Sequence, residues 1–134
     1  MIKWLEKKRF ISFLITALIS IEIYYISSLE FAAGALGNPW PARIYHVMIF
    51  FLFGTFLFIL IKGKKEVNIK NFAIVSIISI IYAILDEVHQ LFVPGRNASI
   101  EDILTDSIGI FSSIIIYTYI SKKQKESKKR LINK

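Results

Sequence analysis

The sequence contains no cysteine, and it has only 3 prolines and 6 glycines among 134 residues. The absence of cysteine excludes disulfide bonds, a thiolate zinc site and a cysteine nucleophile. Acidic residues are also few, 10 against 17 lysines and arginines, which gives a formal net charge of +7. In a soluble protein such a balance would indicate nucleic-acid binding, so the positions of the charges decide what it means.

Hydrophobic residues make up 54% of the chain, and the mean hydropathy is +0.55. They gather in four runs of about 18 to 20 residues, the length that crosses roughly 30 Å of hydrocarbon as a helix. We therefore predict an all-α membrane protein, in which four transmembrane helices form a small bundle within a single domain, residues 1–134. The predicted helices cover residues 10–28, 44–61, 72–91 and 103–120, and a basic tail follows at 121–134.

The basic residues lie almost entirely on one side of this arrangement. Four precede the first helix, four lie between the second and the third, and seven follow the fourth, which makes 15 of the 17. Cytoplasmic loops carry the excess of lysine and arginine. We predict a multi-pass protein of the cell membrane with both termini in the cytoplasm. The positive charge then contacts anionic lipid head groups, and no nucleic-acid partner is predicted.

The stretch LDEVHQLFVPGR, residues 85–96, concentrates polar side chains at the outer end of the third predicted helix. It carries Asp86, Glu87, His89, Gln90 and Arg96. Ionisable groups inside a membrane are costly and usually mark a functional position. The sequence therefore predicts a polar pocket that is open to the outside.

Helical spacing groups the polar and small residues into rows, because residues three and four apart share one face of a helix. Small residues in such a row let a second helix approach closely, and polar ones find partners there. We expect these rows to face one another across the pocket. They are Tyr82, Asp86 and His89 beside Glu87 and Gln90; Asp102, Asp106, Gly109 and Ser113; and His46, Phe50 and Gly54. Asp102 also has a structural role available, since Ser99 three residues earlier predicts a capping box for the fourth helix.

The block DEVHQLFVPGRNASIEDILTDSIG, residues 86–109, resembles the signature of the VanZ-like family, small bacterial membrane proteins named for a teicoplanin-resistance protein. YYISS at 24–28 and IYHVMIFFLFG at 44–54 resemble the family's first and second helices. Where the family usually has Asn, this chain has Asp106. The resemblance implies a four-helix membrane protein linked to reduced teicoplanin susceptibility, and it implies no particular reaction. The family pattern maps onto Asp86, Glu87, Gln90, Pro94, Gly95, Arg96, Asp102, Asp106 and Gly109.

Three interpretations of the polar residues remain open. In the first, they bind a lipid-linked cell-wall precursor or a phospholipid head group without turning it over. The candidate binding residues are then Arg96, Asp86, Gln90, Asp102, Asp106 and Arg43.

In the second interpretation the protein is an enzyme that acts on a lipid phosphate or a peptidoglycan precursor. Glu87, His46 and His89 are then the candidate acid–base residues, and the arginines hold phosphate, because a guanidinium grips phosphate at two points.

In the third interpretation the polar residues only pair with one another, with Arg96 bridging to Glu87 or Asp102 and His46 to Asp106. A metal site is a variant of the first two, because the histidines and acids are suitable ligands. The chain contains no His-x-x-x-His spacing, so no metal and no cofactor are predicted. The sequence predicts no oligomeric state.

Overall fold

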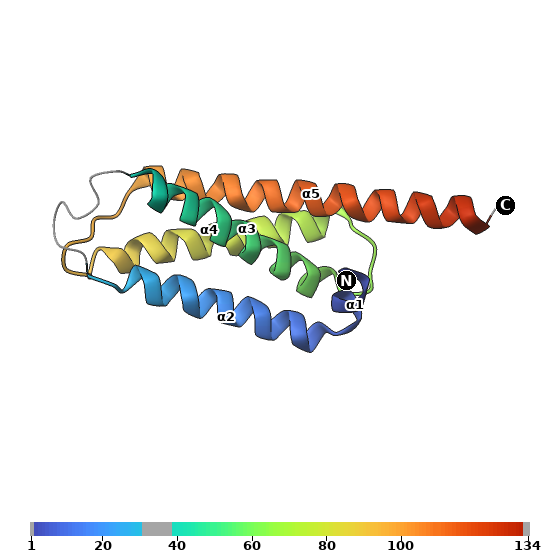
Figure 1. The fold of residues 1–134 in the computed structure, drawn as a ribbon, viewed down its shortest axis with the longest axis horizontal. Helices are drawn as coiled ribbons and strands as arrows, with labels where there is room; N and C mark the ends of the chain where they lie inside the picture. Colours follow the sequence, from blue (N-terminus) through green and yellow to red (C-terminus); the bar gives the residue numbers. More distant parts are fainter. Residues whose placement is uncertain (1, 31–38, 133–134) are drawn as a thin grey trace.

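The computed structural model describes residues 2–30 and 39–132, and within these ranges every regular element is a helix and no strand occurs. Four of the five helices are long and apolar enough to span a membrane, which confirms the all-helical prediction and agrees with the four predicted spans. Figure 1 shows these four side by side, with the first short helix at one end of the bundle and the last helix extending beyond the others. The helices are α1 (Ile2–Lys7), α2 (Arg9–Ser27), α3 (Trp40–Lys62), α4 (Ile69–Gln90) and α5 (Ile100–Ile132).

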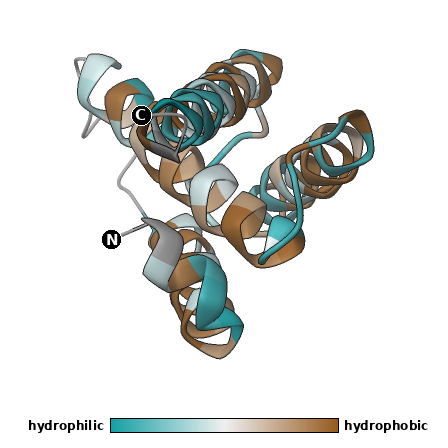
Figure 2. Ribbon diagram, turned by 90° about the vertical axis from the view of Figure 1, so that its right-hand side faces the viewer, coloured by the Kyte–Doolittle hydropathy of each residue, from teal (hydrophilic) through white to brown (hydrophobic). Residues whose placement is uncertain are grey.

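Large apolar side chains cover the outside of the bundle. Phe10, Leu18, Met48 and Ile115 are each at least 60% exposed. Figure 2 shows apolar residues on all four long helices, including the sides turned away from the other helices. A helix that is apolar all round belongs in a protein core or in lipid. The surface is therefore that of a multi-pass membrane protein.

Helix α3 occupies the centre and contacts each of the other four helices. Its Phe50 and Phe58 are fully buried, as are Ile110 and Ile114 on α5. These four side chains form the middle of the apolar core, which continues onto α2 and α4. The seam between α3 and α5 thus places the polar ends of these two helices next to each other.

Two glycines allow α3 and α5 to approach closely. A Cβ atom added to Gly109 would collide with the carbonyl oxygen of Val47 and lie 3.0 Å from the amide nitrogen of Phe51, both in the backbone of α3. A Cβ atom added to Gly54 would instead meet the hydroxyl of Ser113, a side chain that can rotate. Small residues at a helix crossing are typical of membrane bundles, and here they are those of the predicted rows.

The helix ends follow local sequence signals. Asn68 and Asn71 cap the start of α4 reciprocally, because each side-chain oxygen accepts the other's backbone N–H, at 2.9 and 3.2 Å. Gly63 ends α3 with a φ of 52°, a conformation that favours glycine. Gly95, with a φ of 78°, lies in the turn before α5.

Three helices are longer than predicted, and one of them, α4, begins at Ile69 rather than residue 72. Helix α3 begins at Trp40 rather than residue 44, because Pro41 is well suited to a first helical turn. Helix α5 continues to Ile132 rather than ending near residue 120. The basic tail contains no glycine or proline before that point. It has five lysines with one arginine, one glutamine and one glutamate, all residues that favour helix. Hydropathy located the membrane portion of α5 and not its continuation.

Candidate functional site

Polar side chains from four helices converge at the end of the bundle where α2 and α4 finish and where α3 and α5 begin. We call six of them the polar cluster, and none of the six is more than 8% exposed. The burial of five of them within an apolar bundle agrees with the predicted rows, which require these positions to point inward, whereas Ser27 was in none of the rows. The polar cluster consists of Ser27, His46, Asp86, Glu87, Gln90 and Asp106.

One row of α4 faces α2. All three of its polar side chains form hydrogen bonds to that helix: Tyr82 donates to the Ser20 carbonyl (2.7 Å), Asp86 accepts from Ser27 (2.5 Å), and His89 bonds to Ser28 (2.9 Å). The ring of His89 also stacks on Tyr24, with centroids 4.6 Å apart. The sequence predicted the row, but it gave no sign that serines at the end of α2 are its partners. This row fastens α2 to α4 and places His89 beside the polar cluster.

The neighbouring row of α4 connects to the start of α5. Glu87 Oε2 accepts the backbone N–H of Ser99 at 2.7 Å, and its Oε1 accepts the amide of Gln90 at 3.2 Å. The same amide donates to Asp86 at 3.1 Å, so Gln90 links the two carboxylates. Each interaction holds Glu87 in a defined orientation.

The predicted capping box is formed only in part. The Ser99 hydroxyl accepts from the backbone N–H groups of Glu101 and Asp102, at 3.1 and 3.4 Å. In a capping box the Asp102 carboxylate would accept the backbone N–H of Ser99, but that N–H donates to Glu87. Glu87 of α4 thus replaces Asp102 as the acceptor of the Ser99 N–H. This hydrogen bond connects the start of α5 to the polar cluster.

His46 and Asp106 form a buried pair between α3 and α5. His46 Nδ1 lies 2.9 Å from Asp106 Oδ1, and the Asp106 side chain is fully buried. The second oxygen, Oδ2, has no hydrogen-bond partner among the described residues. Both residues were predicted at this site. The third interpretation of the sequence, in which the polar residues only pair with one another, predicted their pairing.

Glu87 lies next to this pair. One atom from each of His46, Glu87 and Asp106 that could ligate a metal ion lies within 4.8 Å of the other two. The charged groups that act on Glu87 and Asp106 are Asp86 and Asp102, which are further acids, and His46, which is a cation only when protonated. The centre of the site is therefore strongly acidic.

The two arginines of this end lie at its periphery. Arg96 donates from Nη2 to the Ile26 carbonyl at 2.7 Å and from Nε to the Leu29 carbonyl at 3.2 Å. The guanidinium thus satisfies carbonyl groups at the end of α2. The third interpretation of the sequence had expected Glu87 or Asp102 as its partners. Arg43 forms an exposed ion pair with Glu101.

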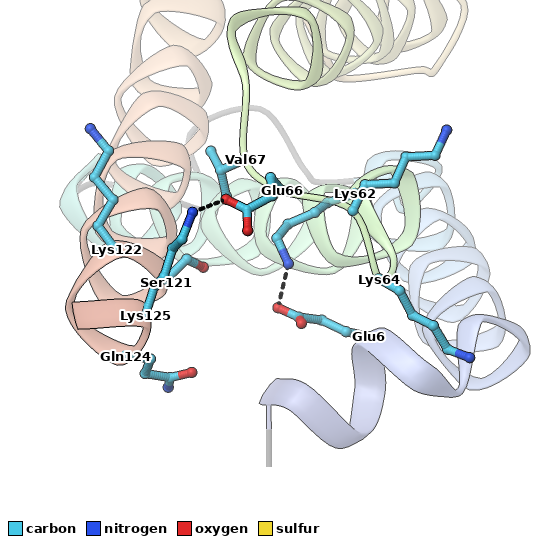
Figure 3. A pocket seen from close by; sticks show the side chains of 10 residues that line it. Glu6, Lys62, Lys64, Glu66, Val67, Ser121, Lys122, Gln124 and Lys125 are labelled. Carbon is cyan, nitrogen blue, oxygen red and sulfur yellow. Dashed lines mark hydrogen bonds and ion pairs between the residues drawn. The ribbon is translucent and has the colours of Figure 1, made fainter. Parts of the chain in front are cut away.

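A cavity of about 500 Å³ lies at the opposite end of the bundle, where no site was predicted. Figure 3 shows lysines around it and the ion pairs of Lys62 with Glu6 and of Lys125 with Glu66. These pairs measure 2.9 and 2.6 Å, and Lys125 lowers the pKa of Glu66. Glu6 also accepts a 2.5 Å hydrogen bond from Tyr117. The basic loops were interpreted as a topology signal and as contacts with anionic lipid head groups, and no sequence pattern indicated this cavity.

Four apolar spanning helices and a buried acidic cluster at one end define a multi-pass α-helical membrane protein with a polar site. The chain matches the model of the VanZ/LLP1 family over residues 4–121, and it belongs to this family. The resemblance of the block at 86–109 is thereby confirmed. Comparison with curated proteins and comparison with solved structures gave no match.

Proposed function

We propose that the protein binds a lipid-linked envelope component at the outer leaflet of the bacterial cell membrane, and that this binding lowers susceptibility to teicoplanin-type glycopeptides. The observation that carries the proposal is the buried acidity of the polar cluster. Asp86, Glu87 and Asp106 are each at most 7% exposed, with one histidine among them. A purely structural network would balance its charges, because uncompensated buried charge is destabilising. An excess of hydrogen-bond acceptors suits a site that binds a ligand with several hydrogen-bond donors.

The distribution of charge supports a ligand class. Hydroxyl, amide or ammonium groups fit the acidic centre, because carboxylates only accept hydrogen bonds when ionised. Arg43 and Arg96 place positive charge at the rim, where guanidinium groups recognise phosphate. A head group that joins a phosphate to a sugar or peptide combines these features. Asp102 and Gln90 complete the proposed set of contacts.

A second candidate function is acid–base catalysis on such a ligand. The pairing of His46 Nδ1 with Asp106 supports it, because a carboxylate that holds one imidazole nitrogen orients the other for proton transfer. Glu87 would be the second proton-transfer group. His89 is a weaker candidate, since it bonds to Ser28 on the α2 side of α4.

The proposal requires the polar cluster to lie outside and both termini to lie in the cytoplasm. We expect a membrane-impermeant thiol reagent to label Asn97→Cys in intact cells and to leave Lys64→Cys unlabelled until the cells are permeabilised. Both positions are exposed, and the chain has no cysteine of its own. Labelling of Lys64→Cys alone would reverse the orientation and remove the polar cluster from the outer leaflet.

The function itself is tested in a teicoplanin-susceptible bacterium. Cells that express the chain should tolerate more teicoplanin than cells with an empty plasmid, and the purified protein in nanodiscs should bind a fluorescent lipid-linked precursor. Glu66→Gln is the control, because Glu66 is exposed and lies at the opposite end of the bundle. Conversion of the bound precursor to product would assign the enzymatic alternative. Absence of both binding and protection at confirmed membrane abundance would overturn the proposal.

A further inference from the structure

The buried group of His46, Glu87 and Asp106 has the donor set of a metal site. One imidazole nitrogen and two carboxylate oxygens come from three different helices, α3, α4 and α5, and lie within 4.8 Å of one another. Nitrogen and oxygen donors of this kind bind divalent first-row transition metals, and zinc accepts both. No short sequence spacing indicates the group, because its members are 41 and 19 residues apart along the chain.

An unsatisfied buried atom points to a ligand at the same place. Asp106 Oδ2 lies in a fully buried side chain and has no hydrogen-bond partner within the described parts of the chain. A buried acceptor without a partner is costly, and native structures usually satisfy it. A metal ion held by this carboxylate would remove that cost.

The local charge favours a cation for an independent reason. Glu87 and Asp106 are surrounded by the further acids Asp86 and Asp102, and among the described residues the basic group that acts on them is His46. Of the two arginines of this end, Arg96 donates to the carbonyls of Ile26 and Leu29, and Arg43 pairs with Glu101. Carboxylates buried at the end of a membrane bundle require protons or a cation, and a divalent ion supplies two positive charges.

We propose that His46, Glu87 and Asp106 bind a single Zn²⁺ ion. Zinc holds nitrogen and oxygen ligands at about 2.0–2.2 Å, so binding draws the three groups closer together. Gln90 and the Ser99 backbone donate to Glu87 and orient it as outer partners. Three protein ligands leave a coordination position open, as in zinc sites that bind substrate or water. The proposal stands whether or not the protein binds an envelope component.

Metal titration tests the proposal directly. The full chain is purified in detergent with an affinity tag that contains no histidine, stripped with a chelator and titrated with ZnCl₂ in a calorimeter. We expect one ion per chain. His46→Gln, Glu87→Gln and Asp106→Asn should each weaken Zn²⁺ binding by more than about 100-fold, since loss of even an outer partner typically costs 10- to 100-fold.

The controls apply the same chemical changes at residues other than His46, Glu87 and Asp106. His89→Gln alters the only other histidine of the chain, and Glu101→Gln alters an exposed carboxylate on α5; both variants should bind Zn²⁺ as the parent does. X-ray absorption of the zinc-loaded parent should show one imidazole and oxygen donors, a result that does not depend on any variant folding. The proposal would be overturned if the parent did not bind Zn²⁺, or if the variants of His46, Glu87 and Asp106 bound it as the parent does. Two imidazoles on the zinc would also overturn it.

Discussion

Glu87→Gln is expected to abolish protection against teicoplanin while leaving the protein folded and abundant in the membrane. The amide oxygen can still accept the Ser99 N–H that ties α5 to α4. The new NH₂ group would face the Gln90 amide, which also donates, so one hydrogen bond worth about 0.5–1.5 kcal/mol is lost. Binding loses a charged acceptor, which corresponds to about 1.5–3 kcal/mol or roughly 10- to 100-fold in affinity.

The measurement compares teicoplanin susceptibility, membrane abundance and thermal stability in detergent across the parent, Glu87→Gln and Glu66→Gln. The control makes the same carboxyl-to-amide change at an exposed position beside the distant cavity. A Glu87→Gln protein that protects as well as the parent would exclude Glu87 from the site. A variant that disappears from the membrane would make its role structural.

Gly109→Ala should lower the free energy of unfolding in detergent by about 1–3 kcal/mol, the usual cost of overpacking a tight core. The added methyl would meet the backbone of Val47 and Phe51, and a helix backbone cannot move aside without separating α3 from α5. Alanine gains about 1 kcal/mol over glycine in a helix. This gain opposes the overpacking cost, so we expect the net loss toward the lower end of that range. Denaturant or thermal unfolding followed by circular dichroism measures the change.

Gly54→Ala is the matched comparison, because the same methyl meets the rotatable hydroxyl of Ser113 at the same helix pair. Its cost should be smaller than that of Gly109→Ala, and Ser113→Ala in the same chain should relieve it. Equal destabilisation by the two glycine variants would mean that the backbone contact at Gly109 does not limit the packing of α3 against α5.

The four helices that are long enough to span a membrane could be predicted from the sequence, because length and hydropathy are properties of each local stretch. The prediction fails for helical segments that are too polar or too short to be marked by hydropathy. The polar end of α5 continues as helix through residues that hydropathy does not mark, and α1 is too short to register as a span. Pro41 is a helix-start signal that the run of apolar residues concealed.

Spacing along one helix predicted which residues of the site share a face, and the structure shows which helix each face meets. The row containing Asp86 faces α2, whereas Glu87 connects to α5. Choosing between these faces requires the order of the helices in space, which no single helix encodes. The reach of Arg96 back to the Ile26 carbonyl spans 70 positions and depends on the path of a loop, so charge pairing alone suggested the wrong partners.

Helix α5 has 33 residues and is therefore about 50 Å long at 1.5 Å per residue, against a hydrocarbon core of roughly 30 Å. If it lies near the membrane normal and begins at the outer edge of the hydrocarbon, about 20 Å of helix, or between three and four turns, extends past the hydrocarbon on the other side. The attraction of a charged leaflet decays over a Debye length of about 8–10 Å at physiological ionic strength. At 1.5 Å per residue, Lys122 and Lys125 then lie about 3–8 Å from the hydrocarbon edge, level with the head groups, while Lys129 and Arg130 lie farther out, at about 14–15 Å. Tilting α5 brings the outer pair toward the surface, so the angle of this helix becomes sensitive to ionic strength and to the lipid composition of the leaflet.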